Sequence, residues 1–224
     1  MSILAHDLRS PFNGLLGMLG LMDNEPEQYT AEQQKEMLDN IKRSALSIFN
    51  LLNDLLAWSK AQAGQLVPNP ETIDLCVSIH EVLTLFESLA ASKQIELRLI
   101  APDVCSAYAD QYFVQTVLRN LLANALKFTP KNGTVKVEML RMPGNIVLRV
   151  SDNGIGIDTD KIKLLWDQSS NYSTRGTDGE AGTGMGLQLC REMVSSWGGE
   201  IGVDSVEGQG STFYFTIPNE TAHS

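Results

Sequence analysis

The chain has 224 residues, a hydrophobic content of 43% and a formal net charge of -10. This length allows one large or two modest globular domains, and the composition is that of a soluble protein. The negative charge disfavours non-specific contact with nucleic acid or anionic lipid. No apolar run reaches the ~18–20 residues of a membrane span, and the N-terminus has no secretory signal pattern. We therefore expect no nucleic-acid partner and no membrane contact by this part of the protein.

The cysteines are odd in number and lie far apart, at Cys76, Cys105 and Cys190. None has the spacing of a zinc ligand, and a disulfide framework needs closer and paired cysteines. We expect buried free thiols and a cytoplasmic location, with a parent protein that can still be tethered to a membrane.

A first amphipathic helix is predicted over residues 2–22, and His6 is its most interesting residue. The histidine lies two residues from Leu4 and two from Leu8, which is about 200° around a helix from each. It therefore points away from the apolar seam, towards water. The seam itself repeats at spacings of three and four and consists of Leu4, Leu8, Pro11, Leu15, Met18 and Met22.

A second helix is predicted from the capping box of Thr30 and Gln33 to about residue 63, with Gly64 as its stop. Two amphipathic helices cannot enclose a core, so we expect two copies to form a dimeric four-helix bundle. An intramolecular bundle is the alternative, but no later heptads are comparable. Only five residues precede His6, so we expect an N-terminally truncated piece of a longer protein. The proline-containing stretch 67–71 is predicted to be an interdomain linker.

The second half mixes helices with strands. A capping box of Ser78 and Glu81 predicts a helix to about residue 91, and Asp110 is expected to cap a helix that ends near Phe128. A further helix is predicted over 184–197. The predicted strands are 95–100, 134–140, 146–150, 200–203 and 212–217. This order favours an α/β sandwich with helices on one face of a sheet, whose strand order stays undetermined.

Three short patterns in this half could bind a nucleotide. Asn120, Asn124 and Lys127 share one side of a predicted helix, where amide oxygens suit a hard cation and the ammonium suits phosphate. Asp152 ends a strand and could accept a hydrogen bond from a base amino group. Gly154 and Gly156 follow it and permit close backbone approach.

The third pattern is a glycine-rich turn at 182–187 that leads into a helix, where backbone N–H groups favour phosphate. It matches neither the P-loop nor the dinucleotide-binding fingerprint. The polar stretch 168–181 before it is long enough for a lid.

Taken together, these motifs resemble those of the sensor histidine kinases of two-component signalling, over nearly the whole chain. Residues 6–11 are similar to the H box of that family, 120–128 to its N box, 152–157 and 182–187 to its glycine-rich boxes, and 208–213 to the segment that follows. The resemblance implies a dimerisation and histidine-phosphotransfer domain (1–66), the linker and a Bergerat-type catalytic ATP-binding domain (72–219).

Carried over by position, the resemblance implies that His6 is phosphorylated by ATP and that Asp7 orients or deprotonates its imidazole. Asn124, assisted by Asn120, would hold Mg²⁺. The other implied nucleotide contacts are Lys127 with phosphate, Asp152 with the adenine amino group, Gly154 and Gly156 around the base, Gly182, Thr183, Gly184, Met185, Gly186 and Leu187 around the phosphates, and Thr212 near the base.

Two positions depart from the family pattern. Trp166 stands in a stretch where the family usually has an aromatic F box, and Ser10 stands where it often has Thr or Asn. Ser10 therefore leaves phosphatase activity open. Arg175 in the predicted lid is a further candidate phosphate contact.

We therefore expect an ATP-dependent protein histidine kinase core that forms a homodimer and passes its phosphoryl group to an aspartate of a response-regulator receiver domain. One alternative is an ATP-driven conformational switch without phosphotransfer, since gyrase and heat-shock ATPases share the Bergerat site. The other is a dimeric scaffold with a degenerate nucleotide pocket.

Overall fold

The computed structural model describes residues 2–24, 29–62, 66–167, 174–178, 180, 184 and 186–218. Side chains are described from Phe12 to Asp23 in the first helix and at a subset of positions in the second. The chain divides into two units, Met1–Lys60 and Ala61–Ser224, each of which has its own fold.

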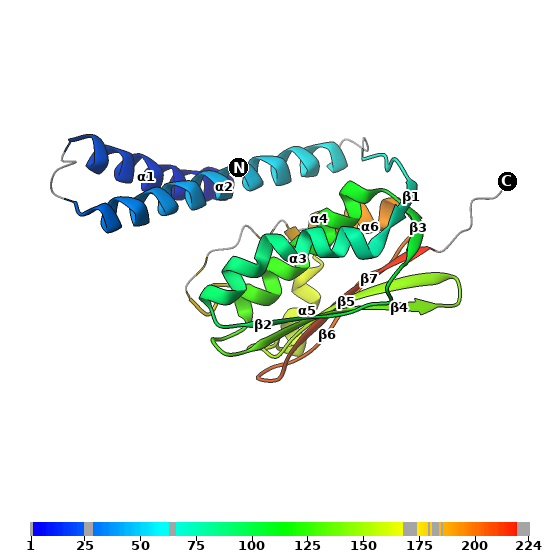
Figure 1. Cartoon of the computed structure of the whole chain (residues 1–224). Coiled ribbons are helices and arrows are strands. Elements are labelled where there is room, and N and C mark those ends of the chain that lie inside the picture. The colour runs from blue at the N-terminus through cyan, green and yellow to red at the C-terminus, as the bar shows by residue number, and fades with distance from the viewer. Residues whose placement is uncertain are drawn as a thin grey trace. The chain divides into compact units, whose positions relative to one another are not determined.

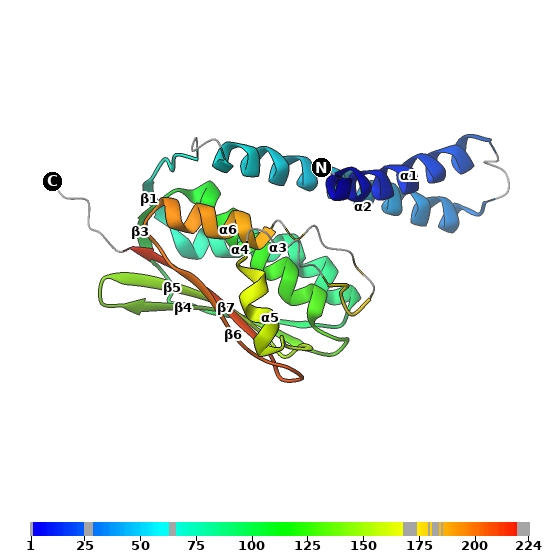
Figure 2. The same cartoon turned by 180° about the vertical axis from the view of Figure 1, so that it is seen from behind.

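The first unit is a helical hairpin. Helix α1 (Ser2–Asn24) runs antiparallel to α2 (Ala31–Gln62), side by side (Figures 1 and 2). The predicted capping box is present at the start of α2, because the Thr30 amide donates to Gln33 Oε1 (2.9 Å) and the Gln33 amide donates to Thr30 Oγ1 (3.3 Å). Both predicted helices are thus confirmed.

Apolar side chains of the hairpin fall into two sets. Those of the predicted α1 seam that the structure describes, Leu15, Met18 and Met22, are half-buried. A second set is exposed and comprises Phe12, Leu16, Leu19 and Leu21 on α1 and Leu38, Leu52 and Leu56 on α2. A single hairpin therefore leaves a substantial apolar surface uncovered.

The second unit is built on a mixed five-stranded sheet in the order β2-β4-β5-β7-β6. Only the β2–β4 pair is parallel. Three helices, α3, α4 and α6, cover one face of the sheet, as the sequence predicted (Figure 1). The sheet strands are β2 (Glu96–Ile100), β4 (Thr134–Met142), β5 (Asn145–Asp152), β6 (Ile201–Val206) and β7 (Gly210–Pro218). The helices are α3 (Leu75–Ser92), α4 (Gln111–Phe128), the short α5 (Thr159–Leu165) and α6 (Gly186–Ser196).

Three short elements were not predicted from the sequence. Strands β1 (Glu71–Asp74) and β3 (Ser106–Ala109) form a separate antiparallel pair, and α5 follows the Asp152 loop. Asp158 caps α5 by accepting from the Asp160 amide.

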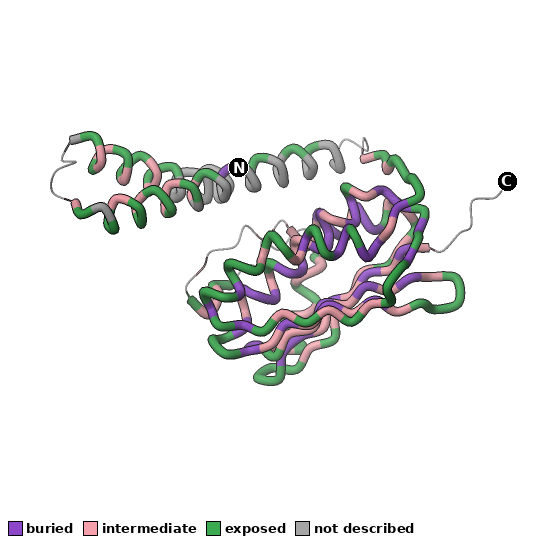
Figure 3. Tube along the Cα trace, viewed as in Figure 1, coloured by how far each residue is buried: buried purple, intermediate pink, exposed green. Residues whose placement is uncertain are grey.

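The core lies between the sheet and its helices (Figure 3). Alternate residues of β4, β5 and β7 are buried, as a half-buried sheet requires. Helix α4 packs on β4 and β5, and α6 packs on β7. The buried strand residues are Val135, Val137, Met139, Ile146, Leu148, Val150, Phe213, Phe215 and Ile217. All three cysteines are buried and free, as predicted.

Helix α4 begins as predicted, because Asp110 accepts a hydrogen bond from the Phe113 amide (3.0 Å). The predicted start of α3 at Ser78 is wrong. Asp74 caps that helix four residues earlier by accepting from the Cys76 amide, and the Ser78 hydroxyl donates back to the Asp74 carbonyl. The predicted start of α6 at Gly184 is also too early, since Gly184 has φ +72° and cannot continue a right-handed helix.

One described helix, α3, is long and apolar enough in composition to span a membrane, with a mean hydropathy of 1.3. A third of its residues are buried inside the unit, and it packs beside α4 (Figure 1). Core helices of globular domains have the same composition, and we interpret α3 as such a helix.

Candidate functional site

The C-terminal end of α4 collects three chain segments that are far apart in sequence. The last four carbonyls of a helix have no partner within it. Here the Leu126 carbonyl accepts from Lys93 Nζ (2.8 Å), the Lys127 carbonyl from the Thr177 amide (3.0 Å) and the Phe128 carbonyl from the Ile155 amide (3.2 Å). The end of α4 therefore joins the end of α3, the segment 174–180 and the loop after β5.

Asn120 lies at the junction of α4 and α6. Its Nδ2 donates to the Thr116 carbonyl one turn earlier (3.0 Å). Its Oδ1 faces the start of α6, because a Cβ on Gly186 would lie 2.6 Å from that oxygen. A side chain at position 186 would therefore have to displace the Asn120 amide, where α6 begins against α4.

Asn124 lies one turn after Asn120 and is half-buried. Within the part of the chain that the structure describes, its side-chain amide makes no hydrogen bond. Amide oxygen and nitrogen are therefore available to a ligand at this position.

Lys127 completes this side of α4. Its ammonium donates to the Thr174 carbonyl (2.9 Å) and lies 4.8 Å from the centre of the Phe128 ring. Burial lowers the pKa of Lys127, and the negative charge of Glu180 partly opposes that shift. The side chain is thus held between α4 and the segment 174–180.

Asp152 ends β5 and turns into the loop that contacts α4. Its Oδ1 accepts from the Gly154 amide (2.8 Å). Burial raises the pKa of Asp152 to about 6, although hydrogen bonds from the Gly154 and Ser211 backbone lower it in part. This carboxylate is largely removed from water, so an unpaired negative charge there is costly. It can therefore discriminate strongly between ligands that donate a hydrogen bond and those that do not.

Two glycines let the Asp152 loop approach its neighbours closely. A Cβ on Gly154 would lie 2.3 Å from the Phe128 carbonyl oxygen, and one on Gly156 (φ +66°) would lie 2.0 Å from the Val206 carbonyl oxygen. The loop is also tied to the β6–β7 turn, since the Gly208 amide donates to the Ile155 carbonyl (2.7 Å). No residue with a Cβ fits at either position without moving the loop, so both must be glycine.

Thr212 lies on β7 directly opposite Ser151, next to Asp152 in the sheet. Its hydroxyl donates to Ser151 Oγ (3.0 Å). The structure thus brings Asp152, Gly154, Gly156 and Thr212 together at one end of β5 and β7.

Other predicted site residues are less fully described. Helix α1 contains His6, Asp7 and Ser10, whose side chains lie outside the described residues, as do Gly182, Thr183 and Met185 entirely. Gly184 precedes α6, and Gly186 and Leu187 begin it. Arg175 is exposed within 174–178. Trp166 is the C-cap of α5, and its carbonyl accepts from Arg191 Nη1 of α6 (2.8 Å).

Sequence reasoning missed Lys93, which is only 4% exposed. Besides the Leu126 carbonyl, its ammonium donates to Thr177 Oγ1 and to Glu180 Oε1, both at 3.0 Å. Burial alone would raise the pKa of Glu180, but backbone amides and the Lys93 ammonium hold it below its usual value. No sequence pattern marks this lysine, because its partners lie 33 to 87 residues away.

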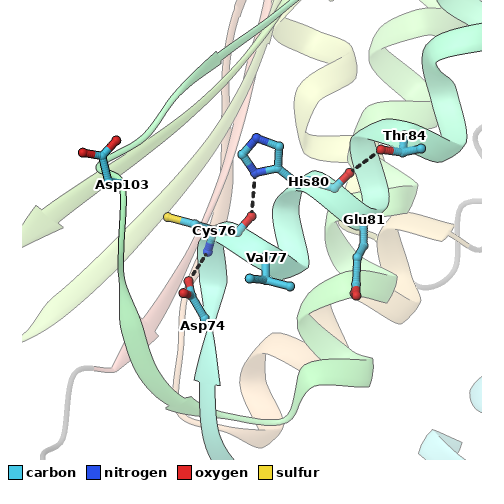
Figure 4. Close-up of a pocket in the computed structure, with 7 residues that line it drawn as sticks. All are labelled: Asp74, Cys76, Val77, His80, Glu81, Thr84 and Asp103. Carbon is cyan, nitrogen blue, oxygen red and sulfur yellow. Dashed lines mark hydrogen bonds between the residues drawn. The ribbon is translucent and has the colours of Figure 1, made fainter.

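A cavity of about 560 Å³ lies elsewhere, on the outer side of α3. It is lined by Asp74, Cys76, Val77, His80, Glu81, Thr84 and Asp103 (Figure 4). Two of its polar groups are engaged locally: His80 Nδ1 bonds to the Cys76 carbonyl (2.9 Å), and the Cys76 thiol donates to the Pro102 carbonyl. Burial raises the pKa of Cys76. None of the predicted nucleotide-site residues lines this cavity.

Two protein-family models match the chain. Residues 109–221 match the histidine kinase-, DNA gyrase B- and HSP90-like ATPases, and residues 1–64 match the His Kinase A (phospho-acceptor) domain. The first match contains α4 and the loops gathered at its end, and it implies ATP binding.

Among curated proteins, the chain is 32% identical to the sensor histidine kinase GacS of Pseudomonas protegens, over 96% of this chain and 24% of GacS. It is 33% identical to the adaptive-response sensory kinase SasA of Gloeothece citriformis, over 97% of this chain and 56% of SasA. The chain thus spans about a quarter to just over half of these relatives. Among solved structures, full-length ShkA in complex with AMPPNP aligns with a TM-score of 0.70 and 28% identity, over 100% of this chain and 46% of ShkA.

Proposed function

This chain belongs to the sensor histidine kinases, and we propose that it is the ATP-dependent core of such a kinase. Residues 1–66 would be the dimerisation and phosphotransfer domain, 67–71 the linker and 72–219 the catalytic domain. The observation that carries the proposal is the arrangement around α4: the Asp152 loop and the segment 174–180 meet its C-terminal end, and the start of α6 lies against Asn120 on the same helix. Both family models support it.

The proposed reaction transfers the γ-phosphoryl group of ATP to a ring nitrogen of His6. The bond between the γ-phosphorus and its bridging oxygen breaks, an N–P bond forms, and ADP leaves with the negative charge. Asp7 would hold the imidazole in the correct tautomer or take its proton. The phosphoryl group would then pass to an aspartate of a response-regulator receiver domain, in the cytoplasm. Ser10 leaves a phosphatase activity open.

In the proposed nucleotide site, Asp152 accepts a hydrogen bond from the adenine amino group, with Thr212 beside it. Gly154 and Gly156 would shape the adenine pocket by letting this loop pack closely against Phe128 and Val206. Lys127 and the exposed Arg175 would contact phosphate, and the turn 182–187 would offer its amides to the phosphate oxygens. The negative charge of the whole chain opposes nucleotide binding, so these local groups must supply the attraction.

Mg²⁺ fits the amide groups on this side of α4. Asn124 has an uncommitted amide, and Asn120 directs its Oδ1 away from α4; oxygen donors of this kind suit a hard cation. No group of three or more His, Cys, Asp or Glu that could hold a metal occurs among the described residues. Nucleotide phosphates would therefore supply part of the coordination. When bound, the ion neutralises charge on the phosphates.

Incubation with γ-labelled ATP tests the proposed activity. We expect label on the protein that acid removes and alkali does not, as for a phosphoramidate. Release of inorganic phosphate without labelled protein would instead support an ATP-driven conformational switch. An absence of any ATP-dependent thermal shift would support a scaffold with a degenerate pocket.

Nucleotide binding is expected to depend on pH through Asp152, whose pKa is raised to about 6. Protonation removes the acceptor for the adenine amino group, so affinity should rise as pH rises through 6 and level off above it. One pH unit below 6, binding should be roughly tenfold weaker. Calorimetric titration with ATP from about pH 5 to about pH 8 measures this.

The control for this pH dependence is Asp152→Asn, which cannot titrate. It should bind more weakly, and the component of the pH profile that comes from Asp152 should be lost. An identical pH profile in both proteins would assign the effect to the nucleotide phosphates instead.

We also propose that two hairpins associate as a four-helix bundle. The exposed apolar residues Phe12, Leu16 and Leu19 on α1 and Leu52 on α2 would be covered by a second copy. Membership of the phospho-acceptor domain family supports this assembly.

Leu16→Glu is expected to convert the dimer to a monomer. Leu16 is 60% exposed in a single hairpin, so the substitution should leave each hairpin folded while it places a charge in the interface. Light scattering coupled to size exclusion measures the mass. Asn13→Glu adds the same charge at an exposed polar position of α1 and should remain dimeric. An unmodified chain that is monomeric at every concentration would contradict the assembly.

A further inference from the structure

We propose that Lys93 is a positioning residue for the nucleotide site: it fastens the segment 174–180 to the C-terminal end of α4. The proposal rests on the proposed function and adds a residue outside the sequence motifs. Lys93 follows α3 directly, and its ammonium reaches α4 and the segment at once. It touches no proposed ligand position and would act through Lys127 and its neighbours.

The contacts of Lys93 explain why a lysine is buried here. A lysine ammonium has three donors, and this one finds three acceptors: the Leu126 carbonyl, Thr177 Oγ1 and Glu180 Oε1. Asp178 adds a second carboxylate at 3.8 Å. The positive charge also lies at the negative end of the α4 dipole. The cost of removing the Lys93 ammonium from water is thus compensated by these acceptors only while the segment 174–180 stays in place.

The same segment determines where Lys127 lies. Thr177 donates through its amide and its hydroxyl to the Lys127 carbonyl, and the Lys127 ammonium donates to the Thr174 carbonyl. Gly176 is packed so closely that a Cβ there would lie 2.5 Å from Lys127 Cγ. Loss of the Lys93 contacts would free the segment and, with it, the ammonium that we assign to phosphate.

The test uses the full chain and two measurements. Lys93→Met keeps most of the aliphatic stem and removes the charge and its donors. Thr177→Val keeps the shape and removes the hydroxyl. Each is expected to raise the dissociation constant and the KM for Mg²⁺–ATP about tenfold, with a smaller change in kcat. Hydrogen exchange at the amides of 174–178 should accelerate in both variants.

Because the two residues belong to one network, the double variant should bind little more weakly than either single variant. Lys93→Arg keeps the charge but not the tetrahedral donor pattern, and it should recover part of the affinity. Lys136→Met removes a partly exposed lysine–glutamate pair on β4, with Glu138 at 3.7 Å, and should change neither measurement.

Nucleotide affinity and exchange equal to those of the unmodified chain, in a folded Lys93→Met protein, would overturn the proposal. Faster exchange with unchanged affinity would overturn it too, since Lys93 would then only stabilise the segment. If Lys93→Met does not fold, Glu180→Gln replaces it, because that carboxyl is partly exposed. Failure of the unmodified chain to bind Mg²⁺–ATP would count against the proposed function itself. The exchange measurement would still test whether Lys93 holds the segment 174–180 against α4.

Discussion

Gly154→Ala is expected to weaken adenine-nucleotide binding by roughly a hundredfold, the equivalent of about two hydrogen bonds. The new Cβ would lie 2.3 Å from the Phe128 carbonyl oxygen and 2.7 Å from Asp152 Oδ1. The loop must then leave α4, and the carboxylate proposed to accept the adenine amino group must move. Calorimetric titration with ADP measures the loss without the need for any phosphotransfer.

Gly144→Ala is the matched control. Gly144 lies in the β4–β5 turn, at the other end of β5, with φ +81° and nothing within 4 Å of an added Cβ. Alanine at this position should lower the free energy of unfolding by about 1–2 kcal/mol, because its Cβ disfavours the left-handed backbone conformation. Nucleotide affinity should stay unchanged. Gly154 has no positive φ, so its effect isolates close packing. If the Gly154→Ala and unmodified chains bound ADP with equal affinity, the assignment of the adenine site to this loop would be wrong.

Asn124→Ala is expected to reduce the rate of His6 labelling about 100- to 1000-fold, with a much smaller effect on ADP affinity. The half-buried Asn124 amide is the group that we assign to Mg²⁺ beside the transferring phosphate. Its removal would weaken the stabilisation of charge in the transition state more than ground-state binding. Initial rates with γ-labelled ATP at saturating Mg²⁺, set beside ADP titrations, separate the two effects.

Gln115→Ala controls for the loss of an amide from α4. Its Nε2 donates to Glu81 Oε2 of α3 (2.6 Å), away from the end of α4 where the loops gather. That variant should label at the rate of the unmodified chain. A parallel loss in both variants would indicate a general weakening of α4, and the assignment of Asn124 to the metal would be wrong.

Elements with strong local signals were predictable from the sequence. The Thr30–Gln33 box and the Asp110 cap are made by side chains and amides within three residues of each other, so the local pattern is sufficient. The strands of the central sheet alternate in burial and could be found by period alone. The helices on one face of the sheet followed from the order of these elements.

Other elements depend on partners far along the chain. β1 and β3 are four residues each and pair across more than 30 residues, and α5 has seven residues and no buried ones. Ser78 offered a plausible capping box, but Asp74 caps α3 first because β1 ends at that residue. The role of Lys93 could not be predicted for the same reason. Nothing in the sequence distinguishes a lysine that follows a helix, and its acceptors are brought near it only by the tertiary structure. The site motifs were recognisable, but their convergence on α4 required the fold.

The most direct test of the central claim is to locate the phosphate. The chain has three histidines, His6, His80 and His223. After reaction with Mg²⁺–ATP and digestion at neutral or alkaline pH, tandem mass spectrometry should find the phosphoryl group on His6. His6→Gln should then incorporate no label while His80→Gln labels as the unmodified chain does. Phosphate on His80 or His223, or undiminished labelling of His6→Gln, would contradict the account.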